Sequence, residues 1–245
     1  MSSNNAITRR ASILAASILT TACGLFTTRS ASAVLISVDF SPGGGPVQTG
    51  AAVFGAAGDV WNGLAGGSGA GVPLVDSTGA ASGAAITYSS NFGGLQAGGS
   101  PMDAGTAPLM TDYLAMDGKL TTVSGLAPNT TYDLAFYGAG DQAAGDQGTT
   151  FILPGNIQSF TTETFAATGS RRLSDGAGVA YTLMSETSDA SGNIQFFVTF
   201  HSTHFGTAPV NGFQIQTAVP EPATGVVLAG AGLALVARRS RRAVR

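Results

Sequence analysis

The sequence predicts an all-β fold, a two-sheet, jelly-roll-like β-sandwich between an N-terminal signal helix and a C-terminal hydrophobic helix. Short runs of β-branched and aromatic residues alternate with turns rich in Gly, Asn, Asp and Ser, which is typical of strands. No long stretch of the body repeats apolar residues with the period of a helix. The strand-like runs are too many for one small sheet, so two packed sheets are expected.

Nine segments of the body are expected to be strands. In chain order they are 34–40, 84–89, 119–123, 132–138, 149–153, 157–162, 179–185, 194–200 and 212–217. The segment 194–200 is apolar on both faces at several positions, as expected of a central strand. Three glycine-rich stretches, 43–50, 63–71 and 93–105, are predicted to be surface loops that fold over one end of the sandwich or are partly disordered.

The first 33 residues have the three parts of a secretory signal peptide. Arg9 and Arg10 form the basic part, and residues 11–26 form an uncharged, mostly apolar part. Ala31 and Ala33 mark a small-residue cleavage site. The predicted signal peptide therefore comprises residues 1–33, and the mature chain begins at residue 34 with the β-sandwich domain of residues 34–218.

The export route stays open between the general secretory and the twin-arginine pathway. The twin-arginine pattern is incomplete, because Ser12 stands where a bulky apolar residue is usual. Cys23 suggests a lipoprotein, but Thr20 occupies the position where Leu is usual. Cys23 is also the only cysteine, so the mature chain is predicted to contain no disulfide and its core alone must hold the fold.

The C-terminal end of the chain has the pattern of a short membrane span. Residues 224–237 carry no charge, and 14 helical residues rise about 21 Å, less than the roughly 30 Å of a bilayer core. The arginines that follow extend this span by snorkelling and are expected to stay cytoplasmic, which places the body on the far side. The membrane stop consists of Arg238, Arg239, Arg241 and Arg242.

A short acidic motif with two prolines precedes the span. Pro220 and Pro222 cannot lie inside a helix, so Glu221 is expected on an extended stalk after Val219. The motif, the apolar segment and the arginine tail together resemble the PEP-CTERM sorting signal of bacterial envelope proteins, over residues 219–245. The resemblance implies that an exosortase, a membrane-embedded cysteine transpeptidase-like enzyme, reads the signal and cuts near the motif.

This resemblance also implies the partners and the location. The expected partners are the exosortase, the export machinery and the membrane, which residues 224–237 span transiently. The expected destination is the cell envelope, the outer surface or the extracellular matrix, after initial anchoring in the inner membrane. The sorting signal says nothing about what the domain of residues 34–218 does there.

The charge of the body excludes one class of partner. Residues 34–218 contain three Lys or Arg and 13 Asp or Glu, a net charge of −10. Nucleic-acid binding needs Lys and Arg that neutralise phosphates, so no nucleic-acid partner is expected. The acidic body is compatible with solubility, with calcium binding and with repulsion from anionic polymers.

Four phrases of the body resemble the galactose-binding-like jelly rolls of carbohydrate modules. They are Ser-Val-Asp-Phe at 37–40, Gly-Asp-Val-Trp-Asn-Gly-Leu at 58–64, Gly-Leu-Ala-Pro-Asn-Thr-Thr-Tyr at 125–132 and Val-Asn-Gly-Phe-Gln-Ile at 210–215. The resemblance implies that the N-terminal strand pairs near the C-terminal one and that a turn ending in tyrosine enters a long strand. That broad group includes sugar binders and domains without a known ligand.

Two sets of residues are candidate binding sites. Trp61 with Asp59 and Asn62 could stack on a sugar and bond its hydroxyls, while the alternative is that Trp61 caps the core. Asp141 and Asp146 lie in a glycine-containing acidic loop and, with Asp39 and Asp59 near the first strand, are candidate calcium ligands, although no full calcium-loop spacing is present. No other cofactor is expected.

The sequence contains no complete catalytic motif, so the chain is expected not to be an enzyme. His201 and His204 are three apart on a strand, so their side chains point to opposite faces and cannot share one metal without a turn. The leading hypothesis is a non-enzymatic structural or interaction protein of the envelope. The alternatives are a module that binds exopolysaccharide and a secreted glycoside-active hydrolase with a carboxylate pair.

Overall fold

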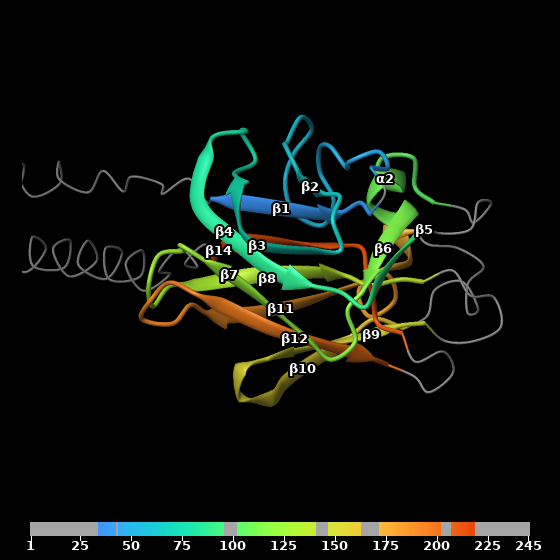
Figure 1. Cartoon of the computed structure of the whole chain (residues 1–245). Helices are drawn as coiled ribbons and strands as arrows, with labels where there is room; N and C mark the ends of the chain where they lie inside the picture. Colours follow the sequence, from blue (N-terminus) through green and yellow to red (C-terminus); the bar gives the residue numbers. More distant parts are fainter. Residues whose placement is uncertain are drawn as a thin grey trace, which may run out of the picture. The chain divides into compact units, whose positions relative to one another are not determined.

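The computed structural model describes residues 34–42, 44–95, 102–140, 147–162, 172–201 and 207–218 (Figure 1). The predicted signal peptide, the sorting segment 219–245 and the acidic loop around Asp141 lie outside these residues. Within the described ranges, no helix reaches the length and hydrophobicity that crossing a membrane requires.

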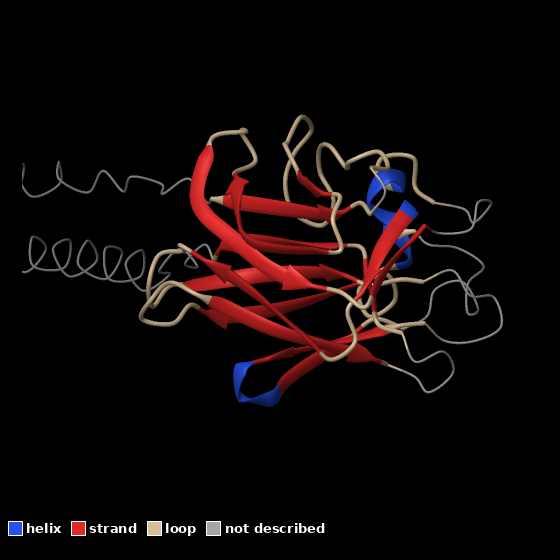
Figure 2. Cartoon of the chain, viewed as in Figure 1, coloured by secondary structure: helices blue, strands red, loops and turns tan. Residues whose placement is uncertain are grey.

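Two large sheets form a sandwich, which confirms the predicted fold class (Figures 1 and 2). The five-stranded sheet runs in the order β11 (Tyr181–Thr187), β8 (Thr131–Tyr137), β14 (Gly212–Thr217), β1 (Leu35–Phe40) and β2 (Asn62–Leu64). The six-stranded sheet runs in the order β10 (Ile157–Phe160), β9 (Thr149–Leu153), β12 (Ile194–Phe200), β7 (Lys119–Ser124), β4 (Ala81–Ser89) and β3 (Ser68–Val75). Neighbouring strands are antiparallel except β1 and β2, which are parallel.

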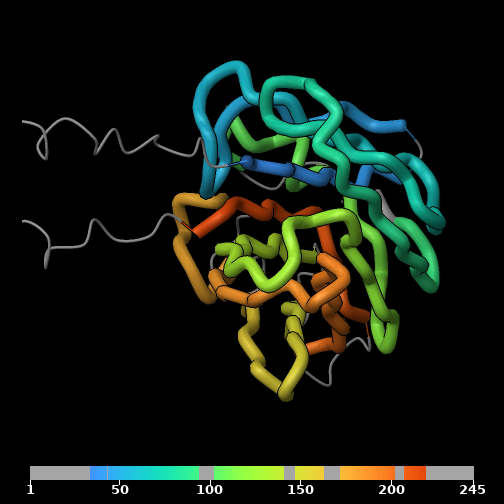
Figure 3. The backbone as a smooth tube through the Cα atoms, turned by 90° about the vertical axis from the view of Figure 1, so that its left-hand side faces the viewer, coloured from blue at the N-terminus to red at the C-terminus, as the bar shows by residue number. Residues whose placement is uncertain are grey.

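A small third sheet and three short helical segments complete the described part. The third sheet contains β13 (Pro209–Val210), β6 (Asp112–Ala115) and β5 (Phe92–Leu95). Helix α2 (Ala107–Thr111) leads directly into β6, and the 3-10 segments are η1 (Pro154–Asn156) and η2 (Leu173–Asp175). The hairpin of β9 and β10, yellow in Figure 3, extends beyond the neighbouring strands.

The main core lies between the two large sheets and is rich in phenylalanine. Phe136 of β8 stacks on Phe151 of β9 with ring centroids 4.6 Å apart, and it meets the edge of Phe196 of β12 at 4.8 Å. Phe196 in turn contacts Phe213 of β14. All four rings are fully buried, so strands from both sheets share one aromatic cluster. Each such side chain contributes about 1.5–3 kcal/mol of burial free energy.

The pairing of the first strand with the last confirms one feature that the jelly-roll resemblance implies. β1 runs antiparallel to β14, with Leu35 opposite Gln216 and Asp39 opposite Gly212. Ile36, Val38 and Phe40 point into the main core, while Ser37 and Asp39 point to the opposite face of the sheet. Both faces of β1 are therefore buried.

The predicted tyrosine turn is also present. Tyr132 is 4% exposed, and its hydroxyl oxygen accepts a hydrogen bond from the Ala127 amide at 3.0 Å. Gly125 has a φ of 77°, and a Cβ at this position would lie 2.3 Å from the carbonyl oxygen of Gly83. Only glycine fits this close approach to the neighbouring β4 strand.

Segments 149–153, 194–200 and 212–217 are strands with the predicted bounds, and the other six predicted strands are found with shifts of a few residues. Two of the predicted glycine-rich loops are partly wrong. Much of 63–71 belongs to β2 and β3, and β5 begins at Phe92. A run of small residues predicts a loop, but backbone pairing at sheet edges needs no large side chain.

The remaining glycine-rich stretch, which is described from residue 44 onward, begins a segment that covers a face of the five-stranded sheet. A second hydrophobic cluster lies on the side of this sheet opposite the main core and includes Trp61, Leu109 and Tyr137. Val53 donates its amide to the Tyr137 hydroxyl at 3.1 Å, and Phe54 donates its amide to Gln214 Oε1 at 2.9 Å. The segment 44–61 therefore packs onto the sheet. Residues 44–50 within it belong to no strand or helix, in agreement with the predicted loop.

Candidate functional site

The structure buries the tryptophan of the predicted sugar set. Trp61 is 5% exposed, its Nε1 donates to the carbonyl oxygen of Gly50 at 2.8 Å, and its ring contacts Tyr137 at 6.2 Å between centroids. A sugar ring stacks only on an exposed aromatic face, and Trp61 offers none. The expectation that Trp61 binds sugar is therefore wrong, and the alternative that it caps a core is correct.

The polar neighbours of Trp61 are also committed to the fold. Asn62 donates its amide to the carbonyl oxygens of Ser37 and Val75, both at 2.9 Å, and accepts the Val75 amide at 2.8 Å. It thus joins β1 to the last residue of β3. Asp59 Oδ2 accepts the Ala56 amide at 2.7 Å and closes a turn. Asn62 thus spends its side-chain amide within the fold, and Asp59 spends one carboxylate oxygen there.

The remaining sequence candidates are placed as follows. Asp141, Asp146 and His204 lie outside the described residues, so the predicted calcium loop stays a prediction. His201 follows β12, and its ring stacks on Phe160 at 4.1 Å between centroids. Its Nδ1 lies 3.4 Å from Thr150 Oγ1.

The best candidate surface is the outer side of four strands in the six-stranded sheet. We call it the outer face and define it by the outward side chains of β7, β9, β10 and β12. Strand pairing places Phe197 directly between Leu120 and Ile152, and the next row contains Thr199, Thr150 and Phe160. The exposed fractions are 48% for Phe197, 44% for Phe160 and 38% for Leu120. None of the outward positions of these four strands is Asp, Glu, Lys or Arg.

A groove of about 360 Å³ adjoins Phe197 on the outer face. Its walls come from the β9–β10 hairpin and from β12, and they include Ile152, Asn156 and Gln195. Gln158 Nε2 donates to Asn156 Oδ1 at 2.6 Å, and Gln195 Nε2 donates to Thr122 Oγ1 at 3.3 Å. The groove therefore combines one exposed aromatic ring with amide groups whose remaining donors and acceptors face solvent.

A neighbouring hollow of about 280 Å³ shares Pro154 and Gln195 with this groove and contains two acids, Glu186 and Asp189. The Asp189 carboxylate accepts hydrogen bonds from the amides of Asn193 and Ser191, both at 2.8 Å. The Asn193 hydrogen bonds are the main cause that lowers the pKa of Asp189 below its usual value. Asp189 is thus held as an anion that shapes a turn, which does not suit a general acid.

The outer face suits a ligand rich in hydroxyl groups and poor in charge. Exposed aromatic rings stack on apolar ring faces, and amides with hydroxyls bond polar edges. The sequence contained part of this signal, because the predicted central strand 194–200 has apolar residues at successive positions. Which of these apolar side chains faces solvent depends on the sheet order, and the pairing of β12 places Phe197 outward.

Comparisons with known proteins identify the tail of the chain. Residues 218–242 match the family model of the PEP-CTERM protein-sorting motif. This match confirms the resemblance found in the sequence and supports an exported protein that an exosortase sorts in the cell envelope. No protein with a curated description matches the chain.

Three solved structures are similar to part of this chain. They are the ANXUR1 extracellular domain from Arabidopsis thaliana (14% identity, TM-score 0.35, 54% of this chain and 42% of that one), CBM35 from Cellvibrio japonicus Abf62 (10%, 0.28, 54% and 91%) and the Arthrobacter globiformis T6 isomalto-dextranase complexed with panose (14%, 0.27, 59% and 22%). The chain thus spans less than half of the first of these structures. At TM-scores below 0.5 they establish neither a shared ligand nor a shared activity.

Proposed function

We propose that this chain is an exported, non-enzymatic interaction protein whose sandwich binds neutral exopolysaccharide through the outer face. The tail, which matches the PEP-CTERM sorting motif, directs the domain to the cell envelope, where extracellular polysaccharide is an available partner. This proposal joins the leading sequence hypothesis with its carbohydrate-binding alternative.

The observation that carries the proposal is the exposed, uncharged row centred on Phe197. Exposed large apolar side chains on neighbouring strands mark interaction surfaces when they are contiguous. Leu120 and Ile152 flank Phe197 by direct strand pairing, and Gln195 and Asn156 supply polar groups at the groove. The body's negative charge disfavours anionic polymers, which leaves neutral glycans as the better ligand class.

The non-enzymatic part of the proposal is supported by the state of the carboxylates. In the described ranges, Glu186 and Asp189 share one hollow, but Asp189 spends its carboxylate on the turn before β12. A glycosidase needs one carboxylic acid with a raised pKa next to a second carboxylate. The lowered pKa of Asp189 is the opposite of what the acid partner requires. Burial raises the pKa values of Asp39 and Asp112, but both side chains are 0% exposed and offer no carboxyl to a bound polymer.

Polysaccharide binding is tested with the full chain in mild detergent on an array of neutral and uronic-acid-containing polysaccharides. We expect retention on at least one neutral polymer. Phe197→Ala should weaken this binding about tenfold, which corresponds to about 1.4 kcal/mol. Phe92→Ala is the matched control, because Phe92 is 49% exposed on β5, away from the outer face.

Both variants should melt like the wild type, since both rings are half exposed. Equal binding by Phe197→Ala and wild type would contradict the assignment of the outer face. Retention on uronic-acid polymers alone would contradict the neutral-glycan assignment. Release of soluble sugars from a bound polymer would contradict the non-enzymatic part and favour the hydrolase.

A further inference from the structure

Two aromatic rings from different strands are stacked at the edge of the outer face. Phe160, the last residue of β10, and His201, which follows β12, have ring centroids 4.1 Å apart and ring planes only 10° apart. Strand β9 lies between β10 and β12, so the two side chains meet over it. Phe160 remains 44% exposed although His201 covers one face of its ring, so its other side faces solvent.

The fold holds His201 in this position. Its backbone amide donates to the carbonyl oxygen of Gly148 at 2.9 Å, and its Nδ1 lies 3.4 Å from Thr150 Oγ1 on β9. Phe160 lies on the last strand of its sheet, where no further strand restricts its side chain. His201 therefore limits the orientations of the Phe160 ring, which makes it a positioning residue.

Strand register fixes the distance between this stack and Phe197. Phe197 pairs with Ile152 of β9, and Ile152 pairs with Gln158 of β10. Phe160 is two residues beyond Gln158, so it lies two strands across and two residues along from Phe197. With strands about 4.8 Å apart and about 3.4 Å per residue, the two Cα atoms are about 12 Å apart. One sugar ring is too small to contact both aromatic rings, so a ligand that uses both consists of linked units.

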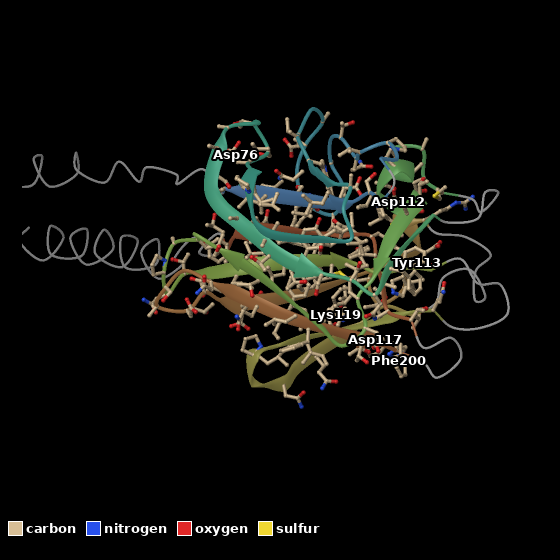
Figure 4. The ribbon with its side chains drawn as sticks, in the orientation of Figure 1. Asp76, Asp112, Tyr113, Asp117, Lys119 and Phe200 are labelled. Carbon is tan, nitrogen blue, oxygen red and sulfur yellow. The ribbon has the colours of Figure 1, made fainter. Side chains whose placement is uncertain are left out.

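The positions between the two aromatic rings are uncharged. Thr150 and Thr199 form the row that contains Phe160. The Thr199 hydroxyl donates to Asp117 Oδ1 at 3.0 Å, and the Phe200 amide donates to the same oxygen at 3.2 Å. Figure 4 shows Asp117 beside Phe200. Asp117 precedes β7, on the side of β12 away from β9, so this carboxylate lies at the margin and not between the rings.

The groove beside Phe197 continues the same line in the opposite direction. Gln195 lies two residues before Phe197 on β12 and lines the groove together with Asn156 of the hairpin. His201 is six positions after Gln195, which corresponds to at most about 20 Å of strand. Amide and hydroxyl groups alternate with aromatic rings along this line. A bound chain therefore finds contacts along β12 over the length of several sugars.

We propose that the outer face has two aromatic subsites, Phe197 with its groove and the Phe160–His201 stack, and that its ligand is a linear glycan long enough to contact both. This inference rests on the proposed function and narrows its ligand from neutral polysaccharide to an extended chain. Two contacts made by one ligand raise its affinity, because the second contact forms within a chain that is already bound. Phe197 is the primary subsite, since the amides of the groove lie beside it.

The experiment measures affinity against chain length by calorimetric titration of the full chain in mild detergent. The probes are oligosaccharides, from disaccharide to hexasaccharide, prepared by partial hydrolysis of the neutral polymer that the array retains most strongly. We expect the affinity of the wild type to be about tenfold higher for the hexasaccharide than for the disaccharide. Phe160→Ala should remove most of this gain and leave the disaccharide affinity unchanged, whereas Phe197→Ala should weaken both.

Two further variants keep the test informative if Phe160→Ala folds poorly. Phe160→Leu retains an apolar side chain without a flat ring and should also lose the gain with length. His201→Ala should act like Phe160→Ala, and His201→Phe should restore the gain because it keeps a flat ring in the stack. Phe92→Ala is again the control, since Phe92 lies on β5 outside the outer face and should bind every probe like the wild type.

The possible outcomes separate this inference from the proposed function. Equal affinities for disaccharide and hexasaccharide, in a wild type that binds the polymer through Phe197, would overturn the inference and leave the proposed function intact. An unchanged gain with length in folded Phe160→Leu would overturn it as well. Failure of the wild type to bind any neutral polymer would overturn both.

Discussion

At the scale of single residues, burial separates the polar side chains that shape this domain from those that could bind a ligand. Trp61, Asn62 and Asp59 are predicted from sequence to form a sugar site because an aromatic residue stands near two polar ones. Their actual partners are Gly50, Val75 and Ala56, all within the chain. A sequence pattern of one aromatic and two polar residues therefore does not distinguish two cases. In one, an exposed ring stacks on a sugar; in the other, the ring is buried and its polar neighbours form hydrogen bonds within the chain.

The role of Trp61 leads to a stability prediction. Trp61→Ala removes a large buried ring and leaves the carbonyl oxygen of Gly50 without its donor, so the free energy of unfolding should fall by about 3–5 kcal/mol. Denaturant unfolding of the full chain measures this loss. Leu183→Ala is a control at a 49% exposed position and should cost far less. A Trp61→Ala variant as stable as the wild type would contradict the second core.

The two buried acids show another limit of sequence at this scale. Asp39 lies in a strand and Asp112 follows a short helix, with 72 residues between them in the chain. The sequence groups Asp39 and Asp59 with Asp141 and Asp146 as acidic candidates, but it does not indicate that Asp112 is buried in the same domain near Asp39. Only the packing of the 44–61 segment across β1 brings Gln48 to Asp39, and no local pattern announces that packing.

At the scale of elements, alternation of apolar residues predicted the strands that have one face in the core. Strand β12 buries Ile194, Phe196 and Val198 and exposes Gln195 and Phe197, so its pattern is clear. β6 is buried at every position, and β3 is short of large side chains and pairs irregularly with β4. Neither has the alternation that identifies a strand from sequence, which explains why both were missed.

The turn between β11 and β12 gives a prediction about pH. Asp189 accepts hydrogen bonds that lower its pKa below 3.8, so the ionised carboxylate stabilises the folded state. This contribution is fully present above the unfolded value of about 3.8 and is lost as pH falls through the lower folded value. Asp189→Ala should therefore be less stable than wild type at neutral pH, and the difference should shrink in strong acid.

Urea unfolding at neutral pH and below pH 3.8 compares these states. Asp189→Asn is the matched control, because it keeps an acceptor for the turn amides but has no charge, so its destabilisation should be smaller and independent of pH. A difference between Asp189→Ala and wild type that stays constant into acid would show that the carboxylate has no ionic role in the turn.

At the scale of the whole molecule, the tail determines the destination of the sandwich. Deletion of residues 219–245 removes the matched sorting motif, so the truncated protein should be released or misplaced in cell fractionation. A second variant with Pro220, Glu221 and Pro222 replaced by alanine keeps the apolar segment and the arginines. It should stay in the membrane fraction without processing.

This pair of variants separates anchoring from sorting. If the truncated chain reaches the same envelope fraction as the full chain, the sorting role of the tail is wrong. The three-part order of the tail was readable from sequence because each part has its own composition: prolines, uncharged small residues and arginines. The proposed binding surface was not readable in the same way, because the outer face is assembled from four strands.

The pairing of β1 with β14 has a consequence for the timing of folding. Ser37 and Gln214, which bond across this pair, are 177 positions apart, and the other neighbour of β1 is the short β2. A chain that crosses a membrane unfolded delivers β1 first and β14 last, and closing so long a loop slows folding. The sandwich can then close only when its last strand has emerged, just as the tail reaches the membrane. Maturation of the domain and its anchoring would thus be set by the arrival of the same stretch of chain.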